Sequence, residues 1–132
     1  LHDALPIWPF SISILDSNKD DFFENPYTDE YMCVSQTIKS EWHEKFPFIA
    51  SKDGTTRAQV VVADSNPDLH RLLTEFQTKS ELGALVNTTL SRVGEALVCS
   101  PEEALNVFMG TDLRYLILED ILVTKREEPV SW

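Results

Sequence analysis

A cluster of hydroxyl, amide and carboxyl side chains in the last third of the chain has residue types that bind anions. These polar residues run from Asn87 to Glu95 and follow residues 84–86, an apolar run typical of a buried strand. Shortly afterwards Ser100-Pro101-Glu102-Glu103 predicts a helix start, with Ser100 as N-cap and Glu103 completing a capping box. In α/β proteins, a polar strand end followed by a helix amino terminus is a common place for anionic ligands. An ordinary connection whose polar residues cap and solvate is the competing interpretation, because the loop lacks the glycines of the phosphate-binding fingerprints.

A second candidate is Arg57. Asp53-Gly54 predicts a turn, and residues 57–62 (RAQVVV) form a β-rich run, so Arg57 is expected at the entry of a strand. A guanidinium group can bind a phosphate or carboxylate through two parallel hydrogen bonds. The chain has 22 acidic against 11 basic residues, so a simple ion pair with a surface carboxylate is the competing interpretation.

Other reactive side chains give no site. His43 stands alone between Trp42 and Glu44, which favours a surface or packing role. The two cysteines, Cys33 and Cys99, are too few and too far apart for a zinc site or a disulfide framework. We therefore predict no bound metal in this chain and a reducing, cytoplasmic location.

Composition limits the class of protein. The 132 residues have room for one domain, and 42% hydrophobic residues suffice for a core. A net charge of −11 argues against a nucleic-acid partner, because nucleic-acid affinity comes from clustered Lys and Arg. No apolar run approaches the ~20 residues of a membrane-spanning helix, so no membrane partner is expected.

The elements that would position these residues alternate between strands and helices. Strands are expected at residues 8–15 (half-buried, through Phe10, Ile12 and Ile14), 31–38, 57–62, 84–86, 113–118 and 121–124. Short helices are expected at residues 20–24, burying two phenylalanines, and around Trp42 and Phe46, ended by Pro47.

Two longer helices complete the pattern. One begins at the cap Asn66, is closed by Gly83, and should cover a sheet with Leu69, Leu72, Leu73 and Phe76. The other runs from Pro101 to Gly110 and should bury Ala104, Leu105 and Phe108. The fold class predicted is an α/β domain with a mixed sheet over residues 8–126, between a non-native leader at 1–7, which resembles adapter read-through, and a tail at 127–132.

Three motifs, in order, resemble the O-carbamoyltransferase family. Residues 87–105 (NTTLSRVGEALVCSPEEAL) look like its C-terminal motif N-T-S-F-N-x-x-G-E-P-I-V-C-T-P-E-D-A. Residues 53–59 (DGTTRAQ) resemble its D-G-T-A-R-x-Q, and residues 26–32 resemble its S-P-Y-M. The resemblance covers roughly residues 8–125 and identifies the chain as a C-terminal fragment of a longer enzyme, inactive alone.

The resemblance implies a YrdC-like fold, a mixed twisted sheet with flanking helices, incomplete at its N-terminus. It also implies that this domain binds ATP, with Mg²⁺, and carbamoyl phosphate to form carbamoyl-adenylate. A separate N-terminal half with its own metal would then transfer the carbamoyl group to an acceptor hydroxyl, as in natural-product tailoring.

The matching positions imply a ligand site. Arg57 would contact phosphate oxygens, and Glu95 would orient the loop or assist Mg²⁺, or else simply face water. The residues expected to act as neutral donors are Thr55, Asn87, Thr88, Thr89 and Ser91.

The chain departs from the family pattern in several places. Thr89 stands where the family has Ser, Ser91 where it has Asn, and Ala96 where it has Pro. The family's L-G-P-R-S-F-G segment does not occur in the chain. Two alternatives therefore stay open: a threonylcarbamoyl-adenylate-type synthase domain, and a catalytically silent nucleotide-binding or interaction module.

Overall fold

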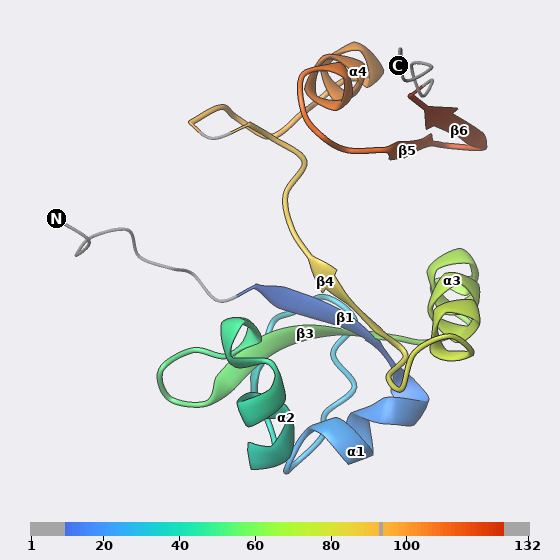
Figure 1. Cartoon of the computed structure of the whole chain (residues 1–132). Coiled ribbons are helices and arrows are strands. Elements are labelled where there is room, and N and C mark those ends of the chain that lie inside the picture. Colours follow the sequence, from blue (N-terminus) through green and yellow to red (C-terminus); the bar gives the residue numbers. More distant parts are fainter. Residues whose placement is uncertain (1–9, 93, 126–132) are drawn as a thin grey trace, which may run out of the picture. The chain divides into compact units, whose positions relative to one another are not determined.

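The computed structural model describes residues 10–92 and 94–125 (Figure 1). The chain divides into two compact units, Leu1–Thr88 and Thr89–Trp132, which are treated separately below. The predicted leader at residues 1–7 and tail at residues 127–132 lie outside the described residues.

The first unit is built on a mixed four-stranded sheet. Its strands are β1 (Ser11–Leu15), β2 (Ser35–Thr37), β3 (Thr55–Val61) and β4 (Ala84–Asn87), in the order β2-β3-β1-β4. β1 runs parallel to β3 and antiparallel to β4, and β2 is antiparallel to β3. The predicted α/β class with a mixed sheet and flanking helices is confirmed.

Helices cover both faces of this sheet (Figure 1). On one face, α1 (Lys19–Phe22) and α2 (Ser40–Lys45) enclose a core with Ile12, Ile14, Ala58 and Val60 of the strands. On the other face, α3 (Pro67–Gln77) packs Leu73 against Leu15 and Val61. The short helix predicted at residues 20–24 is present but begins at Lys19 and ends at Phe22, and the predicted burial of Phe22 and Phe23 is confirmed.

The central strand β1 is buried on both faces, not on one as the alternation predicted. Ile12 and Ile14 face α1 and α2, whereas Ser13 and Leu15 face α3, and all four are buried. The alternation of polar and apolar residues was misleading because Ser13 is buried with a hydrogen bond to Gln59 (2.8 Å).

The strand predicted at residues 31–38 is reduced to β2. The carboxylate of Asp29 accepts hydrogen bonds from the backbone N–H groups of Tyr31 (3.1 Å) and Val34 (2.6 Å). These bonds turn the chain, and Met32 takes a left-handed φ of 57°. An extended strand is therefore impossible before Ser35.

The first long helix is confirmed with two corrections. Asn66 caps α3 by accepting the Leu69 N–H (3.2 Å), as predicted. The helix ends at Gln77, well before Gly83, and of its four apolar residues only Leu73 is fully buried, while Leu72 is 50% exposed. Gly83 instead allows a close approach, since a Cβ there would lie 2.6 Å from the Leu15 side chain.

β4 was predicted to be buried and is a half-exposed edge strand. It pairs with β1 alone, and Val86 is 48% exposed. An apolar run of three residues does not distinguish an edge strand from a central one.

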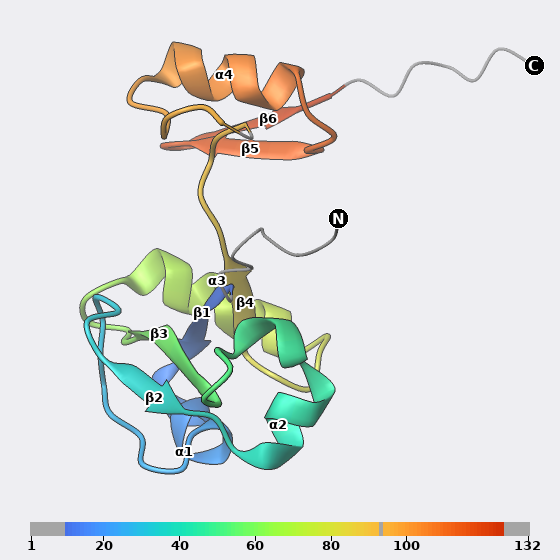
Figure 2. The same cartoon turned by 90° about the vertical axis from the view of Figure 1, so that its left-hand side faces the viewer.

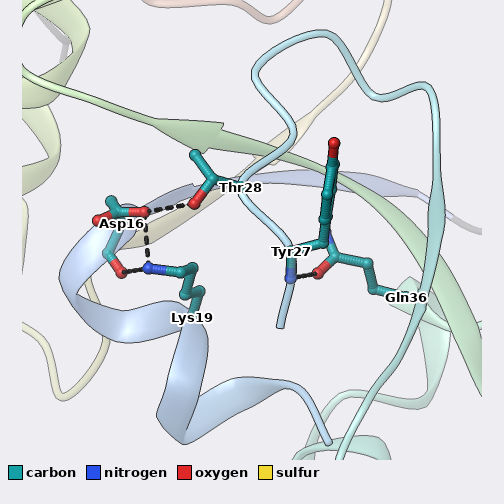
Figure 3. Close-up of polar contacts among 5 residues, drawn as sticks. All are labelled: Asp16, Lys19, Tyr27, Thr28 and Gln36. Atoms are coloured by element: carbon teal, nitrogen blue, oxygen red, sulfur yellow. Dashed lines mark hydrogen bonds and ion pairs between the residues drawn. The ribbon is translucent and has the colours of Figure 1, made fainter. Parts of the chain in front are cut away.

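Two polar contacts fix the segment that leads to Asp29 (Figure 3). The Asp16 carboxylate accepts hydrogen bonds from Lys19 Nζ (2.8 Å) and Thr28 Oγ1 (3.0 Å). The Gln36 side-chain oxygen accepts the backbone N–H of Tyr27 (2.8 Å). Residues 26–29 are thereby attached to the end of β1 and to β2.

The second unit consists of α4 (Pro101–Met109) and a hairpin of β5 (Tyr115–Leu118) and β6 (Ile121–Thr124) (Figure 2). The predicted N-cap is confirmed, since Ser100 Oγ accepts the Glu103 N–H (3.2 Å). The return bond of the predicted capping box is shifted by one residue, because the Glu103 carboxylate accepts the N–H of Cys99 (2.7 Å) and not that of Ser100. α4 buries Ala104 and Phe108 as expected, but Val107 is buried in place of Leu105, which is 38% exposed.

Candidate functional site

Arg57 lies in β3 with its side chain exposed. Among the described residues, no carboxylate oxygen lies within ion-pair distance of its guanidinium group, so the competing interpretation of a simple surface ion pair finds no support there. Because side chains alternate along a strand, Arg57 shares a face with Gln59 and Val61, the face that α3 covers at Val61. The cation is therefore available to a ligand on this face.

Asn87 ends β4 on the same face. It pairs with Ser11 of β1, one residue before the pair Ile12–Ala58, so Arg57 and Asn87 flank the start of β1. Two strand spacings separate them, about 10 Å between backbones. Arg57 and Asn87 thus lie on one face of the sheet, with β1 between them.

Gln59 and Ser13 complete this polar area, although neither was a candidate from the sequence. Ser13 Oγ donates to Gln59 Oε1 (2.8 Å), which leaves the Gln59 amide N–H groups as donors. The signal was present, since Gln59 ends the motif at 53–59 and lies two residues after Arg57. We call Ser13, Arg57, Gln59 and Asn87 the polar sheet face.

The loop that begins at Asp29 reaches this face. The side-chain amide nitrogen of Asn87 lies 3.7 Å from the sulfur of Met32. The Asp29 carbonyl accepts the N–H of Val60 in β3 (2.8 Å), so the loop contacts the sheet at two strands, β3 and β4. The motif at residues 26–32 and the motif at residues 87–105 therefore meet at the sheet face that carries Arg57, which belongs to the motif at residues 53–59.

Thr55 has a hydroxyl that is already engaged. Its Oγ1 donates to Asp53 Oδ1 (2.8 Å), and its backbone N–H donates to the same atom (3.1 Å). These hydrogen bonds, the hydroxyl's first, hold the pKa of the exposed Asp53 carboxyl below its usual range. With Gly54 at φ 76°, they shape the turn that brings Arg57 into β3.

Thr88 ends the first unit with an exposed side chain, and the remaining candidates belong to the second unit. We call residues 89–92 and 94–95 the motif loop. Within it, Thr89 Oγ1 and Ser91 Oγ lie 3.4 Å apart, and Glu95 Oε1 lies 3.9 Å from Arg92 Nη1. β4 and α4 thus fall in different units, whereas the sequence suggested one continuous strand–loop–helix element.

An apolar cavity of about 390 Å³ lies elsewhere in the first unit, along β4. Its walls include Trp42, Phe46 and Phe48, and the ion pair of Lys45 with Glu81 (2.6 Å) lies at its edge. None of the candidate ligand residues lines this cavity. Its apolar lining offers little to an anion.

Residues 10–92 and 94–125 contain no cluster of three or more His, Cys, Asp or Glu side chains arranged to hold a metal ion. Over the same ranges, no helix is long and apolar enough to cross a bilayer. Cys33 and Cys99 are exposed free thiols.

Comparison with known sequences gives a consistent family. The profile described as carbamoyltransferase C-terminus matches residues 6–125. An uncharacterised protein of Synechocystis is 30% identical over 92% of this chain and 23% of its own length. The nodulation protein NolO of Bradyrhizobium diazoefficiens is 30% identical over 89% of this chain and 22% of its own.

A relative with a chemically descriptive name matches a shorter part. The 3'-hydroxymethylcephem-O-carbamoyltransferase of Streptomyces clavuligerus is 33% identical over 58% of this chain and 14% of its own length. The chain thus spans about a fifth of the length of the first two relatives. The match over residues 6–125 shows that the chain belongs to the carbamoyltransferase C-terminus family.

Proposed function

We propose that this chain is the nucleotide- and carbamoyl-phosphate-binding part of an O-carbamoyltransferase. It would bind ATP, with Mg²⁺, and carbamoyl phosphate and support formation of carbamoyl-adenylate. The carbamoyl group would then pass to an acceptor hydroxyl in another, N-terminal part of the enzyme. The observation that carries the proposal is the exposed Arg57 beside Gln59 and Asn87, without a carboxylate partner among the described residues.

The chemistry needs fixed positive charge and fixed donors. Phosphate and carbamoyl oxygens carry or develop negative charge during adenylate formation, and groups held in place stabilise that charge without reorganising. Arg57 supplies a planar cation that suits phosphate oxygens. The amides of Gln59 and Asn87 supply neutral donors, and both residues lie in strands, which keeps their backbones rigid.

The motif loop, in the second unit, carries further groups suited to phosphate or Mg²⁺. Thr88, Thr89 and Ser91 carry hydroxyl groups, and Glu95 carries a carboxylate suited to Mg²⁺. Thr55 acts on the site through the Asp53 turn, because its hydroxyl is engaged there.

The names of relatives favour the carbamoyltransferase over the threonylcarbamoyl-adenylate alternative. The Streptomyces relative is named for O-carbamoyl transfer to a hydroxymethyl group, which is the reaction type proposed here. We include a YrdC-like fold and a cytoplasmic location in the proposal. The two exposed free thiols suit a reducing compartment.

Calorimetric titration of the 132-residue chain with MgATP and with carbamoyl phosphate tests the proposal. Binding should weaken by about 10- to 100-fold in Arg57→Ala, as expected for a lost charge-assisted hydrogen bond. Arg71→Ala, which removes an equally charged, exposed side chain from α3, should bind as the unmodified chain does. Equal affinities for Arg57→Ala and the unmodified chain would remove Arg57 from the site.

A further inference from the structure

We infer that Arg92 is a positioning residue that holds the motif loop against the carboxyl end of α4. Gly110, which has no side chain, leaves the space that the guanidinium group of Arg92 occupies. Arg92 lies at a position the family motif leaves open. Its effect on ligand affinity rests on the proposed function, whereas its effect on the conformation of the loop does not.

The first contact is a hydrogen bond to the helix. Arg92 Nη2 donates to the backbone carbonyl of Asn106, at 2.7 Å. Asn106 lies in the last turn of α4, and the same carbonyl also accepts the Gly110 N–H (3.1 Å). The carbonyls of the last turn carry partial negative charge, so a cation is favoured there.

The second contact is the close steric approach of the Arg92 guanidinium group to Gly110. A Cβ built on Gly110 would lie 1.9 Å from Arg92 Nη2 and 2.6 Å from its Cζ. The guanidinium group therefore occupies the space in which any other residue at position 110 would place its side chain. The φ of Gly110 is −93°, so the backbone conformation suits any residue, and a Cβ at this position would have to displace the guanidinium, the far end of a flexible side chain.

The loop has a second, independent attachment. The Val98 N–H donates to the Leu90 carbonyl (3.3 Å), and both side chains pack against the core that contains Phe108. At the other end of the loop, the Glu95 N–H donates to the Arg92 carbonyl (3.0 Å), with Gly94 at φ 82°. Leu90 and Val98 thus fix the base of the loop, where its two ends meet, and Arg92 fixes the tip of the loop.

Arg92 therefore acts on the site through other residues. Its guanidinium is committed to the Asn106 carbonyl, and its distance of 3.9 Å to Glu95 is that of a weak, exposed ion pair. Ser91 and Glu95 lie within the segment held between the base and the tip. Releasing Arg92 should alter where these two candidates are held.

Amide hydrogen exchange measured by NMR on the 132-residue chain tests the attachment directly. In Arg92→Ala and in Gly110→Ala, the Glu95 amide should exchange about tenfold faster or more, as expected for loss of a hydrogen bond to a charged group. The Phe108 amide, inside α4, reports whether the helix itself is intact. Arg114→Ala, which removes another exposed arginine of the second unit, should leave the Glu95 amide unchanged.

The double variant Arg92→Ala/Gly110→Ala distinguishes one shared contact from two separate effects. If the guanidinium needs the space at Gly110, the double variant should exchange no faster at Glu95 than the single variants do. Unchanged Glu95 exchange in Arg92→Ala, with Phe108 protected, would overturn the inference, as would additive effects in the double variant.

Titration with MgATP then separates this inference from the proposed function. Faster Glu95 exchange together with weaker MgATP binding in Arg92→Ala supports both. Faster exchange in a chain that binds no MgATP even when unmodified leaves the positioning role intact and rejects the proposed function. Weaker binding with unchanged exchange would make Arg92 a direct ligand and overturn the positioning role.

Discussion

Ser13 Oγ donates a hydrogen bond to Gln59 Oε1 at 2.8 Å, across 46 residues of sequence. This bond engages the oxygen of the Gln59 amide within the protein and leaves its N–H groups as donors, two residues along β3 from Arg57. A carboxylate in place of the Gln59 amide would keep an oxygen that accepts the Ser13 hydrogen bond and would replace the N–H donors by a negative charge.

The variant Gln59→Glu makes that replacement. It retains an acceptor for Ser13, so the fold should be preserved, but it places a carboxylate next to Arg57 on the polar sheet face. We expect affinity for MgATP and carbamoyl phosphate to fall by about tenfold or more, because a like charge now opposes the anion and Arg57 gains a competing partner. Titration calorimetry measures the change.

The control for this variant is Gln77→Glu at the end of α3, which adds the same charge at a residue that does not belong to the polar sheet face. It should bind with unchanged affinity. If both variants bind equally well, the polar sheet face does not hold the anion.

The core of the first unit depends on Leu73 far more than on its neighbour. Leu73 is fully buried between α3 and the sheet, whereas Leu72 is 50% exposed. We expect Leu73→Ala to lower the free energy of unfolding by about 2–5 kcal/mol and Leu72→Ala by about 0.5 kcal/mol. Urea denaturation of both variants checks this; similar losses would mean that α3 packs differently.

Asp16 should make stability depend on pH in the acid range. Its pKa is lowered from 3.8, first by the hydrogen bond from Lys19 and then by that from Thr28, so the folded state binds the proton less readily than the unfolded state. The stabilisation is present above that value and is lost as the pH falls below it.

The corresponding experiment compares Asp16→Asn with the unmodified chain from pH 6 to pH 2. Asn resembles the protonated acid, so the unmodified chain should be more stable at pH 6 and the difference should shrink towards pH 2. Asp16 is 41% exposed, so the difference should be about 0.5 kcal/mol or less. A difference that grows as the pH falls would contradict the assignment.

In the second unit, Ser100→Ala removes the side-chain acceptor that caps α4. We expect a loss of about 1 kcal/mol in the local stability of the helix, the usual cost of a lost N-cap. Hydrogen exchange of the α4 amides measures this locally, which matters because the chain has two units. Glu102→Ala serves as a neighbouring control, since only Glu103 bonds back to the Cys99 N–H.

The sequence predicted the positions of helices and strands better than the burial of their side chains. Strong local signals, such as the Asn66 and Ser100 caps and the spacing of Trp42 and Phe46, gave helices at the right places. Burial was less predictable, because it depends on distant partners. β4 has the composition of a buried strand and lies at an edge, and Ser13 looks exposed by its type and is buried with Gln59.

The candidate site shows the same division. The motifs pointed to Arg57 and Asn87, and the strand order explains how one face carries both. The engagement of Thr55 by Asp53, and of Arg92 by Asn106, depends on side-chain geometry that no spacing rule contains. Gln59 could have been predicted from the sequence, because residues two apart in a strand lie on the same face and Gln59 is two residues after Arg57.

The place of β1 in the sheet sets an order of events during synthesis of the chain. Among the described strands of this sheet β1 comes first in the sequence, it is one of the two interior strands, and its neighbours β3 and β4 are made much later. On the ribosome β1 must wait, unpaired, until residue 61 and then residue 87 have emerged, whereas the contacts of α4 with the β5–β6 hairpin form between near neighbours. During that interval the apolar side chains of β1 are open to wrong partners, so misfolding and aggregation threaten the first unit more than the second.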